Sequence, residues 1–142
     1  YATGSGLPQD YAEAAKWYRK AAEKGRSTAQ SNLGVLYLRG QGVEADPPEA
    51  MKWFAKAAAQ GNPTAQFNLG MACREGKYVP KNLVEAYKWL HLSAEQGDPE
   101  ADALRVEVSL ELNPKQIAEA IQLAGQFVPS AMPATVKPDS IE

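Results

Sequence analysis

The stretch that decides the fold spans residues 29–61 and reads AQSNLGVLYLRGQGVEADPPEAMKWFAKAAAQG. Its landmarks return at a fixed interval of 36 residues. All three tryptophans keep this interval, at Trp17, Trp53 and Trp89, and so do ten of the eleven glycines, with only Gly125 left over. Self-similarity of this kind is the signature of a repeat architecture. We therefore expect stacked copies of one unit rather than an ordinary globule.

The interval also divides the chain into parts. Tyr1 aligns with Tyr37, so we expect the chain to open inside the first helix of a unit and to be a piece of a longer protein. Residues 26–61 and 62–97 are identical at 15 of 36 positions. The predicted parts are a partial unit with its second helix (1–25), two full units (26–61 and 62–97), two capping helices (98–127) and an extended tail containing prolines (128–142).

Composition excludes several classes of protein. The 142 residues include 15 basic and 17 acidic side chains, a balance that argues against an electrostatic nucleic-acid binder. No apolar run approaches the roughly 20 residues that cross a bilayer, so no direct membrane insertion is expected for this segment. A single cysteine and a single histidine exclude a disulfide framework and a multi-cysteine zinc site. The chain is expected to carry no cofactor and no metal.

Each unit contains the pattern of two helices. Ala29, Leu33 and Leu36 form an apolar stripe at helical spacing, which predicts a first helix over 27–39. Arg26 cannot cap this helix, so Ser27 is expected to do so.

The second helix carries a stronger start signal. Asp10, Asp46 and Asn82 occupy equivalent positions, and each is followed three residues later by a glutamate. This spacing is typical of a capping box. Because it recurs at every second helix, we interpret these acids as caps rather than as a catalytic carboxylate pair.

Two glycines lie inside first helices. Gly34 and Gly70 each cost about 1 kcal/mol of helix propensity relative to alanine. We expect them to allow close approach of the second helix, whose alanines would offer a flat surface. The three tryptophans are expected to fill the wider gap between units, as core residues rather than as a ligand cage.

The pattern resembles the Sel1-like repeat, a relative of the tetratricopeptide repeat. The third unit departs from it at Cys73, Tyr78, Asn82 and Ser93, and the resemblance fades after Ala101. The second unit matches it in full, at Ala29, Leu33, Gly34, Tyr37, Gly40, Gly42, Val43, Asp46, Ala50, Trp53, Ala57, Ala58 and Gly61.

This resemblance implies an all-α fold: a right-handed α-solenoid of antiparallel helix pairs with a C-terminal capping pair. Family members mostly act as adaptors that hold a protein or peptide partner in the groove lined by first helices. The resemblance favours a periplasmic or secreted bacterial protein, and the module is expected to be a monomer. A cysteine-rich subgroup linked to β-lactamase activity carries two cysteines per unit. This chain has one in total, so it is expected not to be an enzyme.

The last predicted helix has its own N-terminal capping signal. Asn113, Pro114 and Gln116 predict a capped last helix. Its inward stripe is expected at Ile117, Ala120, Ile121 and Ala124.

Two single residues are candidates for chemistry. His91 lies two residues after Trp89, an offset that predicts a solvent-facing side chain. Cys73 takes the tyrosine position of the repeat, which predicts a packed, inert thiol.

The candidate groove follows the exposed strip of the first helices. Asn32 and Asn68 directly precede Leu-Gly, and by resemblance asparagines take a similar position in tetratricopeptide domains that clamp a peptide carboxylate. An amide can also both donate to and accept from an extended backbone. A structural spacer and a carbohydrate- or cell-wall-binding module remain alternatives. The predicted groove residues are Asn32, Val35, Arg39, Asn68, Met71 and Arg74.

Overall fold

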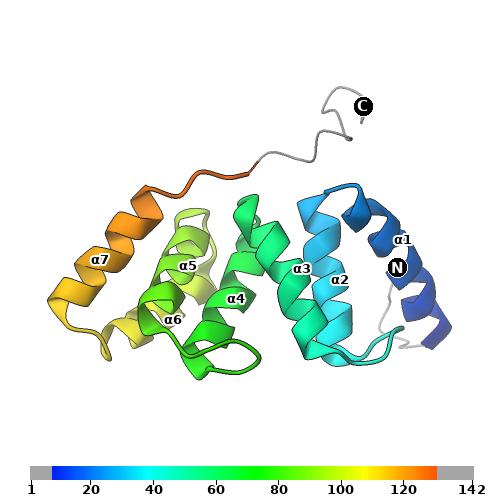
Figure 1. Ribbon diagram of the computed structural model, residues 1–142, viewed down its shortest axis with the longest axis horizontal. Coiled ribbons are helices and arrows are strands. Elements are labelled where there is room, and N and C mark those ends of the chain that lie inside the picture. Colours follow the sequence, from blue (N-terminus) through cyan, green and yellow to red (C-terminus); the bar gives the residue numbers. More distant parts are fainter. Residues whose placement is uncertain (1–7, 131–142) are drawn as a thin grey trace.

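The computed structural model describes residues 8–130, and this part of the chain is built from helices with no strand. Figure 1 shows them as a row of antiparallel pairs, which confirms the predicted all-α solenoid. None of the helices in this region is long and apolar enough to span a membrane. The helices are α1 (Pro8–Glu23), α2 (Ser27–Arg39), α3 (Pro47–Ala59), α4 (Pro63–Glu75), α5 (Leu83–Glu95), α6 (Pro99–Ser109) and α7 (Pro114–Gly125).

Two glycines allow the helices of a unit to meet closely. A Cβ atom added to Gly34 of α2 would lie 2.8 Å from the ring of Phe54 on α3. The same addition to Gly70 of α4 would lie 2.9 Å from Leu90 on α5. The predicted close approach is therefore confirmed, but its partner is a large, fully buried side chain rather than an alanine surface.

The three tryptophans differ in burial. Trp53 is 7% exposed and packs against Ala22, Ala29 and Leu33 of the two preceding helices. Trp17 is 63% exposed, so the prediction that it fills a gap between units is wrong. Trp53 is covered by the two helices before its own, α1 and α2. Within residues 8–130 no helix precedes α1, so Trp17 has no such cover.

Most of the predicted caps form. The side chain of Asp46 accepts the backbone N–H of Glu49 at 3.2 Å, and Asn82 accepts that of Glu85 at 3.0 Å. Asn113 and Gln116 form a complete capping box at the start of α7. These bonds support the interpretation of the acids as caps.

Two cap predictions are wrong. Asp10 lies inside the first turn of α1, because that helix already begins at Pro8, whose fixed φ suits a first helical position. Ser27 is the first helical residue of α2, while Arg26 holds the extended N-cap conformation without a side-chain bond. Neither residue therefore caps its helix.

The last helix, α7, covers the end of the solenoid through a narrow contact. α7 packs chiefly on α5, with Ala120 and Ala124 buried at the contact. Ile121 is 44% exposed, so its predicted inward position is wrong. Packing chiefly on one helix leaves a narrow contact, and Ile121 lies about 100° around the helix from Ala120.

The loops between paired helices need a left-handed residue. Gly42 has φ +76°, and a Cβ atom there would lie 2.3 Å from the backbone of Tyr11 on α1. Tyr78 occupies the equivalent position in the next unit with φ +68°, and its side chain is 51% exposed. A bulky residue in this region is strained by about 1–2 kcal/mol.

Tyr78→Gly is expected to raise the free energy of unfolding by about 1 kcal/mol, since it removes left-handed strain and little buried surface. The opposite change at the equivalent position, Gly42→Ala, is expected to lower the free energy of unfolding by more than about 1 kcal/mol, because the added Cβ atom meets the backbone of α1. Urea unfolding followed by circular dichroism measures both. A destabilised Tyr78→Gly variant would contradict the assignment of strain.

Candidate functional site

Asn32, one of the predicted groove residues, lines a surface cavity. It lies half-buried on α2, and the cavity has a volume of about 570 Å³. Trp17 and Tyr18 of α1 contribute aromatic walls, while Arg26 and Gln60 contribute polar groups. The site therefore combines apolar surface with an amide and a guanidinium group.

The second asparagine has a different setting. Asn68 is half-buried on α4, and its amide donates to the Thr64 carbonyl of the same helix at 3.0 Å. It does not line the cavity of Asn32. The structure therefore keeps the two asparagines on equivalent positions of successive first helices without joining them in one pocket.

The other predicted groove residues are engaged to different degrees. Val35 packs against the buried cluster around Phe54 and thus contributes to the core. Met71 is half-buried, and Arg39 is exposed. Arg74 makes an ion pair with Glu107 of α6 at 3.1 Å, which joins two successive first helices. Of the two arginines, only Arg39 has its side chain mainly in solvent.

The prediction that His91 faces solvent is wrong. Its side chain is 16% exposed and stacks on Tyr87, with ring centroids 6.1 Å apart. Arg105 of α6 lies 2.8 Å from Nδ1, and the Glu95 carboxylate lies 3.3 Å from Nε2. The prediction used only the position of His91 relative to Trp89 on one helix, whereas in the structure α6 covers this side of α5. Since arginine has no acceptor atom, its contact requires an Nδ1 without a proton.

Paired glutamines join the units, a feature that the sequence analysis missed. Gln30 donates to the Ala22 carbonyl at 3.1 Å, and Gln60 donates to the Gln30 side chain at 2.9 Å. The pair Gln66 and Gln96 repeats this bond 36 residues later, at 2.9 Å. Gln30 and Gln66 are buried. The signal was present, because these glutamines recur at identical positions in both units.

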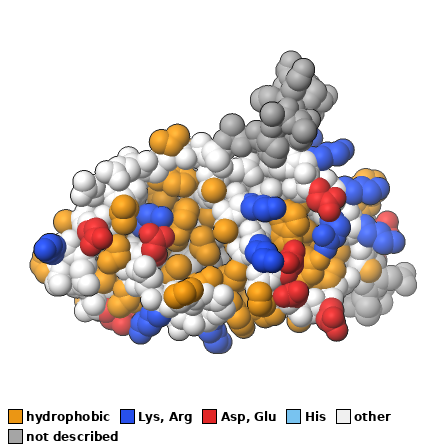
Figure 2. Space-filling model, in the orientation of Figure 1, with side chains coloured by type: hydrophobic (Ala, Val, Ile, Leu, Met, Phe, Trp, Pro, Cys, Tyr) orange, Lys and Arg blue, Asp and Glu red, His pale blue; other side chains and the backbone are white. Residues whose placement is uncertain are grey.

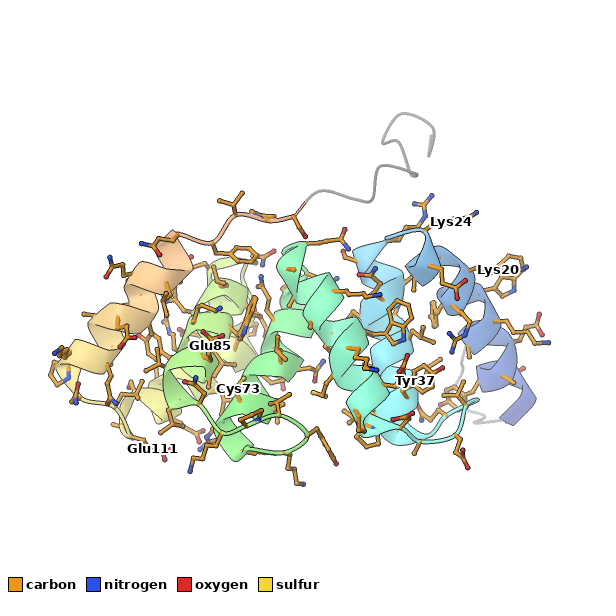
Figure 3. The ribbon with its side chains drawn as sticks, viewed as in Figure 1. Lys20, Lys24, Tyr37, Cys73, Glu85 and Glu111 are labelled. Atoms are coloured by element: carbon orange, nitrogen blue, oxygen red, sulfur yellow. The ribbon has the colours of Figure 1, made fainter. Side chains whose placement is uncertain are left out.

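Cys73 is buried on α4, as predicted for a packed thiol. Burial raises the pKa of the thiol, and the nearby Glu85 carboxylate raises it further, against a smaller opposing effect of Lys88. Figure 3 shows Cys73 and Glu85 on the neighbouring helices α4 and α5. Across residues 8–130, no three His, Cys, Asp or Glu side chains are grouped so as to hold a metal ion.

Comparison with known sequences identifies the repeat. The sequence model of the Sel1 repeat matches residues 1–25, 27–62 and 63–98. No curated protein sequence matches the chain.

Two solved structures share the solenoid. One is a protective antigen of uropathogenic Escherichia coli strains with an SLR fold, at 32% identity and a TM-score of 0.81 over 92% of this chain. The other is a Sel1 repeat protein from Oxalobacter formigenes, at 40% identity and a TM-score of 0.72 over 86% of this chain. The chain spans 28% and 51% of these two proteins, respectively.

Gln66→Ala is expected to lower the free energy of unfolding by about 2 kcal/mol, because it removes a buried amide and leaves its partners without that bond. The exposed Gln122 on α7 provides the control, and Gln122→Ala is expected to change stability by less than about 0.5 kcal/mol. Thermal unfolding measures both variants. Equal effects would show that the glutamine pair does not stabilise the stack.

The thiol of Cys73 is expected to react slowly with a disulfide reagent at pH 8 in the folded chain. The raised pKa keeps it protonated, and burial limits access. In denaturant the rate should rise at least a hundredfold, measured by absorbance of the released thiolate. A fast reaction of the folded chain would contradict the buried, protonated state.

Proposed function

The chain belongs to the Sel1 repeat family, and we propose on this premise that it is a protein-interaction module that binds an extended peptide segment of a partner along α2 and α4. Sel1 repeats generally mediate protein interactions, and their fold is typically non-catalytic. The observation that carries the proposal is the position of Asn32 in a cavity with two aromatic walls.

The chemistry of this cavity suits a peptide. The Asn32 amide can donate to a backbone carbonyl and accept from a backbone N–H. Trp17 and Tyr18 offer apolar surface to a side chain of the partner. Arg26 is exposed and can hold a carboxylate through two parallel hydrogen bonds. The volume of about 570 Å³ falls in the range of roughly 300–1,000 Å³ that is usual for ligand sites.

The equivalent position on α4 extends the proposed surface. Asn68 offers a second amide one unit further along, and Met71 lies one helical turn beyond it with a half-buried, adaptable side chain. An extended peptide that crosses both helices would meet one amide from each unit. The ion pair of Arg74 with Glu107 marks the far end of this strip at α6.

The partner class follows from charge and family. The chain carries 15 basic and 17 acidic side chains, and Figure 2 shows the two kinds interspersed on the face that it draws, so the proposed partner is a protein or peptide rather than nucleic acid. We place the module in the periplasm or outside the cell, where Sel1 repeat proteins are often found, and we take it to act as a monomer.

The double variant Asn32→Ala, Asn68→Ala tests the proposal. Capture of partners by the immobilised chain, measured by quantitative mass spectrometry, should fall about tenfold, the effect of losing two hydrogen bonds of roughly 0.7 kcal/mol each. The melting temperature should change little. Gln122→Ala, on an exposed position of α7, serves as the matched control.

Other outcomes separate the alternatives. Unchanged capture by the double variant would contradict the assignment of these asparagines and favour a structural spacer. Strong binding on a glycan array, abolished by free sugar, would instead favour a carbohydrate-binding module.

A further inference from the structure

The described chain runs past α7 along one edge of the solenoid. Figure 1 shows this segment passing from the end of α7 above α5 towards the upper ends of α4 and α3. We call this side the turn edge, because the turns that follow α1, α3 and α5 lie along it. The ring of Phe127 packs edge-on against Trp89 of α5, with ring centroids 5.7 Å apart. The segment is therefore anchored to the edge by an aromatic contact.

Two further contacts follow along the same segment. Pro129 lies against Gly61 in the turn after α3, where an added Cβ atom would be 3.7 Å from the proline ring. The N–H of Ser130 donates at 2.7 Å to the carbonyl of Ala59, the last residue of α3. The segment is thus held through an aromatic residue, the proline two positions later and the next backbone N–H.

The groups that hold this segment recur 36 residues earlier in the chain. The earlier positions are Trp53 for Trp89, Gly25 for Gly61 and Glu23 for Ala59. Gly25 has φ +93° and Gly61 has φ +99°, so the two turns share one left-handed form. Glu23 is the last residue of α1, and the last carbonyls of a helix have no intrahelical donor. The earlier unit therefore offers the same aromatic wall, glycine turn and helix-end carbonyl.

These three earlier positions line one cavity. Trp53, Gly25 and Glu23 all belong to its wall, and its volume is about 450 Å³. Within residues 8–130, the segment after α7 contributes only Ser130 to this wall. The cavity therefore repeats the site of Phe127 and receives neither an aromatic ring nor a proline from that described segment.

The lining of the two sites is alike apart from two positions. These are Lys56 in place of Leu92 and Ala59 in place of Glu95. The ammonium group of Lys56 lies 4.8 Å from the centre of the Trp53 ring. In the later site the ammonium group of Lys88 lies 4.1 Å from the Trp89 ring, and Phe127 packs on that ring as well. A lysine over the indole is thus compatible with an aromatic contact.

The chain itself has no suitable second segment for this cavity. An aromatic residue followed two positions later by proline occurs twice in the sequence, at 127–129 and at 78–80. The first of these already occupies the later site. In the second, Tyr78 has φ +68° and Val79 packs against the buried cluster around Phe54, so this loop is not an extended segment. The observations favour a segment of another protein.

We propose that the cavity lined by Trp53 binds an extended segment of a partner protein in which an aromatic residue is followed, two positions later, by proline. The aromatic ring packs against Trp53, the proline lies on Gly25, and the next backbone N–H donates to the Glu23 carbonyl. This site is on the turn edge and does not depend on the function proposed for α2 and α4.

Titration of the full chain with a synthetic peptide tests the proposal. The probe is acetyl-Gly-Gln-Phe-Val-Pro-Ser-amide, which copies residues 125–130. In a chain with isotope-labelled tryptophan, the indole N–H resonance of Trp53 should shift and saturate with a dissociation constant of about 1 mM or below. The resonance of Trp17 should stay in place. The Trp53 N–H is buried and meets no acceptor among the described residues, so an aromatic ring or carbonyl placed nearby changes its surroundings.

Matched variants locate the binding. Peptides in which alanine replaces the phenylalanine or the proline should each bind at least about fivefold more weakly, because one contact is lost. In the chain, Ala59→Leu adds bulk to the cavity wall and should weaken binding to a similar degree. Ala55→Leu, at an exposed position one turn earlier on α3, should leave binding unchanged.

The contrary outcomes are distinct. The proposal is overturned if Trp53 does not shift at up to about 5 mM peptide, or if all three peptides bind equally. A shift of Trp89 alone would show exchange with the chain's own segment and would also contradict it. A Trp53 resonance that moves with chain concentration in the absence of peptide would place a second copy in the cavity, with the same consequence.

Discussion

The solenoid depends on one close contact inside each unit: the ring of Phe54 lies against the backbone of Gly34, and Leu90 repeats this against Gly70. No side chain larger than hydrogen fits between these atoms, so the two helices of a unit share one tightly packed seam. This seam buries only part of the apolar surface of a unit. A single helix pair cannot cover its own apolar face, and stacking of neighbours completes the core.

Stacking then needs a register, and polar groups supply it. Within a unit, a hydrogen bond joins the last turn to the first helix, from Gln60 to Gln30 and again from Gln96 to Gln66. The first-helix glutamine of each pair also donates to a carbonyl of the preceding unit, Gln30 to Ala22 and Gln66 to Ala58. A buried amide pair is costly when misaligned, because each unmatched group loses its partner. The glutamine pairs therefore fix the stacking register between neighbouring units.

Much of this fold is predictable from periodicity, and the wrong predictions of burial have a common cause. The bounds of α2 and the caps at Asp46 and Asn82 depend on local geometry that a 36-residue pattern records, and the cap at Asn113 depends on the local signal of Asn113, Pro114 and Gln116. The exposure of Trp17, His91 and Ile121 depends instead on which helix lies alongside. The repeat pattern treats equivalent positions alike, whereas within residues 8–130 α1 packs chiefly on α2, α7 packs chiefly on α5, and α6 covers His91. The glutamine pairs were visible in the pattern, but their role appears only when side chains from two helices meet.

Two surface cavities of the solenoid meet at one side chain. Gln60 lines the cavity of Asn32 and also a second cavity of about 450 Å³, whose walls include Trp53 and Lys56. Its amide is already held by Gln30 at 2.9 Å, so replacing it would disturb the stacking register and both cavities together. Asn32 and Lys56 each line only one of the two cavities. The two cavities are thus joined through one side chain but differ in their lining, with Asn32 and two aromatic rings in one and Trp53, Lys56 and Gly25 in the other.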